Sequence, residues 1–140
     1  RQRQMCIRDS LSPGEPPRCF RMPETERDVF ELLKNIKGWG GRRALLEFVR
    51  SQPGMGRKSI FTFGRGYGGL RMALIALDIP FEEVTPVTWQ SAMKCLSGGD
   101  KKITKARAQE LFPQVKAAGD VWDSLLIAEY GRRNSRVRLA

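Results

Sequence analysis

The stretch that decides the fold is Ala44-Leu45-Leu46-Glu47-Phe48-Val49-Arg50-Ser51-Gln52-Pro53-Gly54-Met55-Gly56. Its first six residues are mostly apolar and rich in strand formers, which predicts a buried strand over residues 44–49. Glu47 lies within this run, and a buried carboxylate must be neutralised, paired or bound to a cation. A Pro-Gly-x-Gly loop with Arg57 and Lys58 follows. An acid beside a basic loop suits a metal-dependent nuclease, whereas a glutamate on an edge strand that faces solvent explains the same residues without a function.

The overall charge of the chain points to a polyanionic partner. The chain has 140 residues, 41% of them hydrophobic, which is enough for one domain with a real core. Its formal net charge is +10, and such a field favours nucleic acid, the commonest polyanion. A membrane surface is the alternative, but the basic residues are scattered, and no apolar run approaches the ~20 residues of a membrane span.

Cysteine and histidine usage narrows the chemistry. The three cysteines (Cys6, Cys19 and Cys95) include no close pair, which favours neither a disulfide framework nor a zinc site and indicates a reducing compartment. The chain contains no histidine, which excludes histidine general bases, the Ser-His-Asp triad and histidine metal ligands within it. Any catalysis must rest on carboxylates, Lys, Tyr, Cys or a metal held by oxygen atoms.

The chain divides into a leader, one domain and a tail. We interpret residues 1–17 as a leader outside the fold, because residues 1–10 (RQRQMCIRDS) resemble translated sequencing-adaptor sequence and a Pro/Gly-rich loop follows. Residues 18–133 form the expected domain, and residues 134–140 a basic tail. Within the domain we expect strands at 18–22, 44–49 and 81–85, and helices at 23–37, 59–77, 86–96, 101–112 and 120–130.

Four glycines interrupt the apolar periodicity of residues 59–77. Gly64, Gly66, Gly68 and Gly69 each cost roughly 1 kcal/mol relative to Ala inside a helix. Close approach of another backbone or of a phosphate strand would offset that cost. A broken helix that begins with a loop is the alternative.

Two acids in the last expected helix are candidate metal ligands. Asp120 and Asp123 are spaced by three and therefore share one helix face. Acids at a helix N-terminus often serve only as caps or dipole partners. Together with Glu47, however, they supply three carboxylates that can hold one or two Mg²⁺ ions, as two-metal phosphodiester hydrolysis requires.

The expected helix at 101–112 is basic. Lys101, Lys102 and Lys105, together with Arg57, Lys58 and Arg65, are candidates for phosphate contacts. The alternative is that the lysine run is only a solvated helix face.

Several motifs in series resemble one family. They are Glu47-Phe48-Val49-Arg50-Ser51-Gln52-Pro53-Gly54-Met55-Gly56, Phe61-Thr62-Phe63-Gly64-Arg65-Gly66-Tyr67-Gly68, Thr85-Pro86-Val87-Thr88-Trp89, Leu96-Ser97-Gly98-Gly99-Asp100-Lys101-Lys102 and Ala106-Arg107-Ala108-Gln109-Glu110-Leu111-Phe112-Pro113. This series resembles the RuvC-like Holliday-junction resolvases, above all their phage and bacterial branch. The resemblance covers about residues 20–133, and its motifs are specific as a series although each alone is weak.

The resemblance implies an α/β, RNase H-like fold with a central mixed sheet flanked by helices. It also implies a homodimeric endonuclease that cuts four-way DNA junctions in recombination and repair, using Mg²⁺ or Mn²⁺, in the cytoplasm of a bacterial or phage-infected cell. Glu47 matches the second-site glutamate of the family, and Asp120 and Asp123 match the acidic pair on its last helix. For the dimer we expect pairing through residues 67–77, where glycines accompany Leu70, Leu74 and Leu77.

One departure from the family pattern bears on activity. Relatives carry a first strand with an Asp-Pro-Gly type metal ligand and a hairpin partner, and Asp9 does not replace that ligand. We therefore expect an N-terminally truncated member that lacks the first strands, leaves one sheet edge open and is weakly active or inactive. A non-catalytic, basic nucleic-acid-binding module of the same fold is the main alternative, and a basic ribosome-associated or structural protein is another. If Glu47, Asp120 and Asp123 do not converge in space, the nuclease hypothesis loses its catalytic site.

Overall fold

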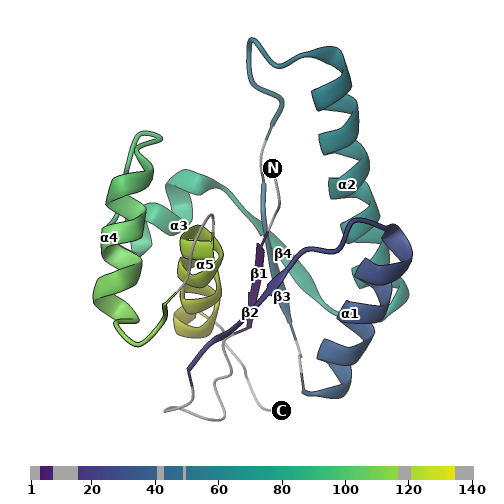
Figure 1. The fold of residues 1–140 in the computed structure, drawn as a ribbon, viewed down its shortest axis with the longest axis horizontal. Coiled ribbons are helices and arrows are strands. Elements are labelled where there is room, and N and C mark those ends of the chain that lie inside the picture. The colour runs from purple at the N-terminus through teal and green to yellow at the C-terminus, as the bar shows by residue number, and fades with distance from the viewer. Residues whose placement is uncertain (1–3, 8–15, 41–42, 49, 117–120, 135–140) are drawn as a thin grey trace. The chain divides into compact units, whose positions relative to one another are not determined.

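The computed structural model describes residues 4–7, 16–40, 43–48, 50–116 and 121–134. The chain packs as two compact units, shown in Figure 1. Unit 1 comprises residues 1–22 and 84–140, and unit 2 comprises residues 23–83. The boundaries of the single domain that we predicted at residues 18–133 stay a prediction.

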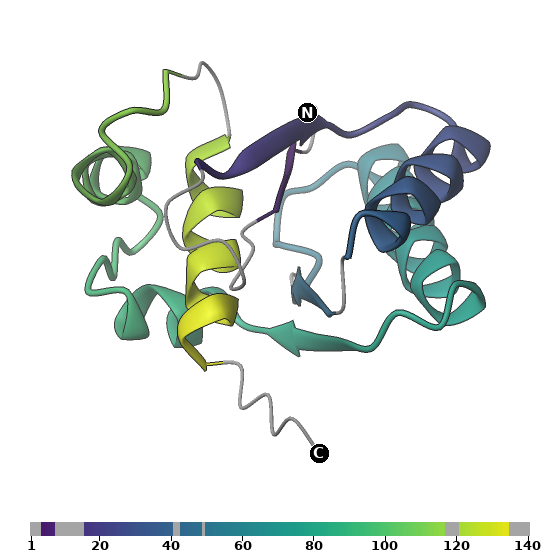
Figure 2. The same cartoon turned by 90° about the horizontal axis from the view of Figure 1, so that it is seen from below.

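Unit 2 is built on two helices that pack side by side, α1 (Glu26–Gly38) and α2 (Arg57–Ala76), as Figures 1 and 2 show. Helix α1 begins at Glu26, three residues after the predicted start at residue 23, because the Thr25 side chain caps it, accepting a 3.1 Å hydrogen bond from the Asp28 backbone N–H. Its buried residues are Leu33 and Ile36, and those of α2 are Leu70, Ala73 and Leu74. The apolar faces of both helices thus lie at 3.6-residue spacing, as burial against a neighbour requires.

Unit 2 also contains a short sheet formed by β3 (Ala44–Glu47) and β4 (Phe81–Val84). The backbone N–H of Ala44 donates to the Pro80 carbonyl at 2.9 Å, so both strands start at the same end, as in a parallel pair joined by helix α2. Leu46 is buried, and Ala44, Leu45 and Glu47 are half-buried. The predicted strand is confirmed over residues 44–47, while Val49 lies outside the described residues.

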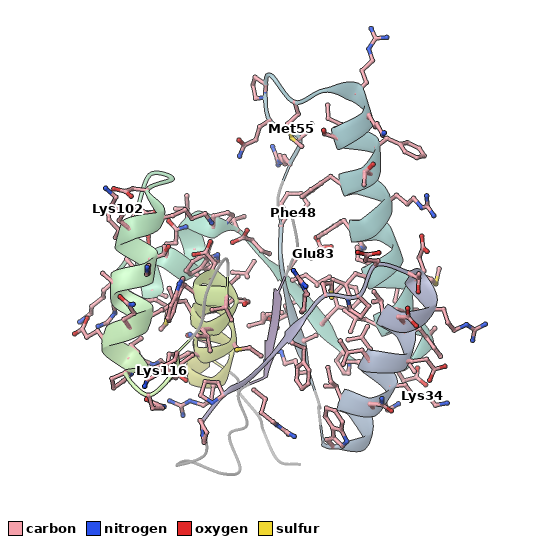
Figure 3. All side chains as sticks on the ribbon, in the orientation of Figure 1. Lys34, Phe48, Met55, Glu83, Lys102 and Lys116 are labelled. Carbon is pink, nitrogen blue, oxygen red and sulfur yellow. The ribbon has the colours of Figure 1, made fainter. Side chains whose placement is uncertain are left out.

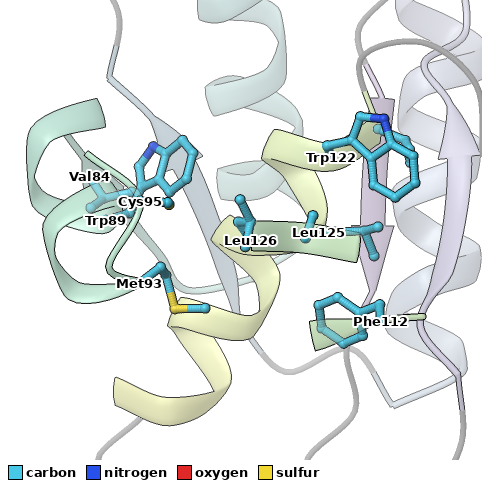
Figure 4. Close-up of a cluster of buried hydrophobic side chains, with 10 residues drawn as sticks. Val84, Trp89, Met93, Cys95, Phe112, Trp122, Leu125 and Leu126 are labelled. Carbon is cyan, nitrogen blue, oxygen red and sulfur yellow. The ribbon is translucent and has the colours of Figure 1, made fainter. Parts of the chain in front are cut away.

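The described residues of unit 1 form three helices: α3 (Pro86–Ala92), α4 (Lys101–Leu111) and α5 (Val121–Asn134). Their apolar side chains form one cluster, drawn in Figure 4. Trp89 of α3, Ala108 of α4 and Leu125 of α5 are each 0% exposed, so all three helices contribute to the centre of this core. The predicted helices are confirmed, although α3 ends at Ala92 rather than residue 96.

Unit 1 also contains β1 (Gln4–Ile7) and β2 (Arg18–Arg21), which pair antiparallel with Cys6 opposite Cys19. This pairing corrects our interpretation of residues 1–17 as lying outside the fold, at least for residues 4–7. Backbone pairing gives a four-residue strand its partner without any alternating sequence pattern that would reveal it. Cys19 is disulfide-bonded, which also corrects the expectation of no disulfide.

The sheet arrangement differs from the expected central mixed sheet. Among the described residues, the strands form two separate two-stranded sheets, β1–β2 and β3–β4, within a mixed α/β architecture. Four-residue strands offer few ladder hydrogen bonds, so each pair ends after a short distance. None of the described helices combines the length and hydropathy needed to cross a membrane.

Candidate functional site

Glu47 lies at the last residue of β3, in unit 2, where it is half-buried rather than enclosed within a longer strand. The residue after it, Phe48, packs edge-on against Tyr67 of α2, with ring centroids 6.4 Å apart at 67°. The Arg50 guanidinium carbon lies 5.6 Å from the centroid of the Phe48 ring. The contact with Tyr67 joins the end of this strand to α2, next to Glu47.

Asp123 lies in the first turn of α5, in unit 1, and its side chain is only 21% exposed. Its Oδ2 accepts a hydrogen bond from the Lys101 ammonium group. Its Oδ1 is buried and has no hydrogen-bond partner among the described residues. A buried polar atom without a partner costs about 1–3 kcal/mol, and more when the group is charged. One carboxylate oxygen at this position is therefore suited to a further cation.

The predicted metal ligands are only partly described. Asp120 lies outside the described residues, while Glu47 and Asp123 belong to different units. Within each unit taken by itself, the described residues include no group of three acidic, histidine or cysteine side chains arranged to hold a metal ion. The three-carboxylate site thus stays a prediction, with the buried Oδ1 of Asp123 as the observation that favours it.

A turn between α3 and α4 presents Lys101 and Lys102. We call residues 97–102 the α4 turn. The Gln90 Oε1 accepts hydrogen bonds from the Ser97 backbone N–H at 3.2 Å and from the Ser97 hydroxyl at 3.1 Å. Asp100 caps α4 by accepting a 2.9 Å hydrogen bond from the Lys102 backbone N–H. Lys102 points outward from this turn in Figure 3.

The remaining basic residues of α4 have two different roles. Lys105 is exposed, as expected for a phosphate contact. Arg107 instead turns inward: its Nε donates to the Met93 carbonyl at 2.8 Å, and its Nη1 donates to Glu110 at 2.9 Å. Arg107 therefore fastens α4 to the end of α3, whereas Lys101, Lys102 and Lys105 are exposed.

The cations of α2 lie in a different setting. We call residues 50–68 the α2 arm. Arg57 and Lys58 are exposed in the first turn of α2, which begins at Gly56 without a side-chain cap. Arg65 pairs with Glu26 of α1, with Nη2–Oε1 at 2.8 Å and Nε–Oε1 at 3.0 Å. Backbone hydrogen bonding and the Arg65 guanidinium hold the pKa of the Glu26 carboxyl below its usual value.

The four glycines lie inside a continuous helix, so the alternative of a broken helix is wrong. A Cβ at Gly64, Gly66 or Gly68 would meet no described atom within 4 Å, and one at Gly69 would meet only the Glu26 Cγ at 3.9 Å. Packing against the described residues therefore does not offset the cost of these glycines. Phe61 of the same arm is 71% exposed.

The predicted dimer patch is partly buried within unit 2. Leu70 and Leu74 belong to the core there, and Leu77 is half-buried, so these leucines do not form an exposed apolar surface. The large exposed apolar side chains of α2 are instead Ile60, Phe61, Met72 and Ile75. The predicted helical spacing of the apolar residues is right, but Leu70 and Leu74 are buried within unit 2, where α2 packs against α1.

Some structurally important polar residues were missed. Arg132 and Arg133, in the last turn of α5, donate hydrogen bonds to the buried carboxylate of Glu129 at 2.7–2.9 Å. The Glu129 carboxylate raises the pKa of Arg132. Their spacing of three and four residues was the available signal. Gln90 and Ser97, by contrast, left no periodic signal.

Comparisons with known proteins agree with this architecture. No protein-family model matches the chain, and no curated protein does. The solved structure of Thermus thermophilus RuvC matches with a TM-score of 0.53 at 13% identity, over 85% of this chain and 78% of that one. T. thermophilus RuvC in complex with a Holliday junction substrate matches with a TM-score of 0.55 at 11% identity, over 85% and 79% of the two chains. The chain therefore shares the fold of these two RuvC structures.

Proposed function

We propose that the chain is a metal-dependent endonuclease domain that acts on branched DNA, in the manner of a Holliday-junction resolvase of the phage and bacterial branch. The observation that carries this proposal is Asp123, a mostly buried carboxylate with one oxygen on Lys101 and the other without a partner among the described residues. Asp123 lies on the last helix, where the family carries the acidic pair that Asp120 and Asp123 match. The RuvC-like fold and the net charge of +10 support the same function.

Glu47, Asp120 and Asp123 are the proposed ligands of Mg²⁺ or Mn²⁺. Such a cation, when bound, neutralises charge on the scissile phosphate and lowers the pKa of a bound water. The residues of the chain orient the substrate around it: Lys101, Lys102 and Lys105 in unit 1, and Arg57, Lys58 and Arg65 in unit 2, contact DNA phosphates. We further propose a homodimer that works in the cytoplasm of a bacterial or phage-infected cell, which suits the two-fold character of a four-way junction.

The Asp-Pro-Gly ligand of the family's first strand does not occur in this sequence. We therefore expect the chain to bind a four-way junction but to cleave it weakly with Mg²⁺. A fused first strand that carries this motif should restore cleavage. Robust cleavage by the present chain would contradict the argument that a ligand is missing.

The decisive experiment compares charge-removing variants in the protein with the fused strand. Asp123→Asn and Glu47→Gln should abolish cleavage and retain junction binding, because each keeps shape and removes one metal ligand. Mn²⁺ binding, followed by electron paramagnetic resonance, should weaken in both variants. Glu31→Gln, at an exposed acid on α1, is the matched control and should change neither property. Full cleavage by both site variants would show that the carboxylates are structural.

The second candidate is a nucleic-acid-binding module without catalysis. The ion pair between Lys101 and Asp123 favours it, because a lysine at a carboxylate satisfies that group without any metal. In that case Mn²⁺ should not bind, and the protein with the fused strand should bind junctions without cutting them.

A further inference from the structure

The α4 turn is tied to helix α3 through one amide oxygen. Gln90 Oε1 accepts two hydrogen bonds from Ser97, one from the backbone and one from the hydroxyl, at 3.2 and 3.1 Å. The Ser97 hydroxyl oxygen in turn accepts from the Gly99 backbone N–H at 3.2 Å. A single half-buried side chain thus fixes both the start and the middle of the turn.

Helix α3 is a firm base for this arrangement. Trp89 and Met93, on either side of Gln90 in the sequence, are 0% and 1% exposed. The backbone carbonyl of Gln90 also accepts from the Cys95 N–H at 2.8 Å, closing the chain reversal after the helix. The position of Gln90 is therefore set by the hydrophobic core of unit 1.

The turn itself has little rigidity of its own. Gly98 and Gly99 have φ of +58° and +96°, in the left-handed region where glycine is favoured, and glycine has the largest conformational freedom in the unfolded chain. Both are exposed. Without side-chain hydrogen bonds, such a segment would sample many conformations.

The turn delivers two cations. The Asp100 backbone N–H donates to the Ser97 carbonyl at 3.1 Å, and the Asp100 side chain caps α4 at Lys102. Lys101 and Lys102 are the first two residues of the helix, and the Lys101 ammonium group reaches Asp123 of α5. The hydrogen bonds therefore run without a break from Gln90 to the helix start that carries both lysines.

From this chain of contacts we propose that Gln90 is a positioning residue for DNA binding, acting through Ser97 to hold Lys101 and Lys102 where they contact phosphate. The inference rests on the proposed function, since it gives the lysines a phosphate partner. Gln90 contacts no DNA itself. Preorganisation of the turn removes the entropy that binding would otherwise spend on ordering it.

The test measures binding of a fluorescent four-way DNA junction to the whole chain. Gln90→Met keeps the length of the side chain and removes the acceptor, and it should weaken binding about fivefold to tenfold, a loss equivalent to ordering one or two side chains. Ser97→Ala should weaken binding similarly, whereas Ser97→Thr, which keeps the hydroxyl, should retain it. Ser91→Ala, at an exposed serine of the same helix, is the matched control. A thermal melt of each variant confirms that it folds.

A double-mutant cycle separates positioning from a merely structural role. In a Lys101→Gln/Lys102→Gln background, Gln90→Met should have no further effect on affinity, because the groups that it positions are gone. An equal loss in both backgrounds would overturn the inference, as would unchanged affinity for Gln90→Met and Ser97→Ala. If the Lys101→Gln/Lys102→Gln protein binds as tightly as the parent, the phosphate contacts of the proposed function fail instead.

Discussion

The α4 turn and the α2 arm both present cations, but they are built in opposite ways. In the α4 turn, the side-chain oxygens of Gln90, Ser97 and Asp100 accept hydrogen bonds from backbone N–H groups and so hold the backbone, and the helix that follows is anchored in the core. In the α2 arm the helix starts without a side-chain cap, and its glycines meet no described atom within 4 Å. The turn that carries Lys101 and Lys102 is thus held by side-chain hydrogen bonds before it binds anything, whereas Arg57 and Lys58 lie at a helix start that no side chain caps.

The largest expected effect comes from reversing charge in the organised region. Lys101→Glu/Lys102→Glu should weaken junction binding about a hundredfold or more near 0.1 M salt, equally for all DNA sequences, because phosphate contacts carry no sequence information. Loss of two contacts should also lower the slope of log K against log salt by about 1.8. Fluorescence anisotropy across a salt series measures both quantities. An unchanged slope would show that the lysines are only a solvated helix face.

The same reversal in the α2 arm sharpens the comparison. Arg57→Glu/Lys58→Glu should lower the salt slope by a similar amount but reduce affinity only about tenfold, because these cations are not held in place before binding. Equal affinity losses for the two double variants would mean that organisation of the turn contributes nothing.

Glycine substitutions should have opposite effects on stability in the two regions. Gly64→Ala/Gly66→Ala/Gly68→Ala should raise the free energy of unfolding, by up to about 1 kcal/mol per site, since an added Cβ meets no described atom nearby. Gly99→Ala should lower it by about 1–2 kcal/mol, because its φ of +96° strains any other residue. Urea unfolding followed by circular dichroism measures both changes.

Association supplies the functional half of this prediction. If another backbone or a phosphate strand approaches the arm closely, the stabilised triple alanine variant should bind DNA or a second copy more weakly. Stabilisation with unchanged association would mean that the glycines serve no close approach.

A smaller effect is expected from the ion pair of the arm. Glu26→Gln should release Arg65 and tighten junction binding about twofold to threefold at low salt, as for removal of one exposed ion pair. The pKa of Glu26 is lowered in the folded state, so its contribution to stability is present above its ordinary value of 4.5 and is lost as the pH falls through the lowered pKa. The variant should lack that part of the acid sensitivity, which unfolding curves between pH 3 and 6 would detect.

The smallest effect concerns the core beneath the α4 turn. Burial raises the pKa of the Cys95 thiol, with Asp123 adding to the rise and Arg107 opposing it. The thiol contribution to stability is therefore fully present below the ordinary pKa of 9.0 and is lost as the pH rises toward the raised folded value. Cys95→Ala should flatten the fall in unfolding free energy between pH 8.5 and 10.5, as measured in urea. An equally steep fall in the variant would assign that loss to other groups.

The sequence predicted the helices well because their starts carry local signals. Thr25, Thr85 and Asp100 are capping residues, and each lies at the N-cap in the structure. Apolar periodicity also identified the buried face of α2, but not whether that face meets α1 or a second copy. The strand pair β1–β2 was missed because pairing of short strands depends on long-range partners.

The candidate site was predictable only in its residue types. Asp123 and Lys101 are 22 residues apart, and nothing in either local pattern indicates that they pair. The bonds between Gln90 and Ser97 span seven residues across a chain reversal, which matches neither helical nor strand spacing. Arg107 is a basic residue of the same helix as the lysines, yet its guanidinium donates a hydrogen bond to the Met93 carbonyl within unit 1. Side-chain direction, rather than residue type, was the missing information.

The charge of residues 48–77, which include the α2 arm, has a consequence for the rate at which DNA associates with the protein. From Phe48 to Leu77, thirty consecutive residues contain five cations and no acid. Such a one-sided field attracts a polyanion over about a Debye length before any contact forms, so it accelerates association and does so most at low salt. Residence time, in contrast, depends on contacts that are already well formed. The arm would then govern how often DNA arrives, and the α4 turn how long it stays.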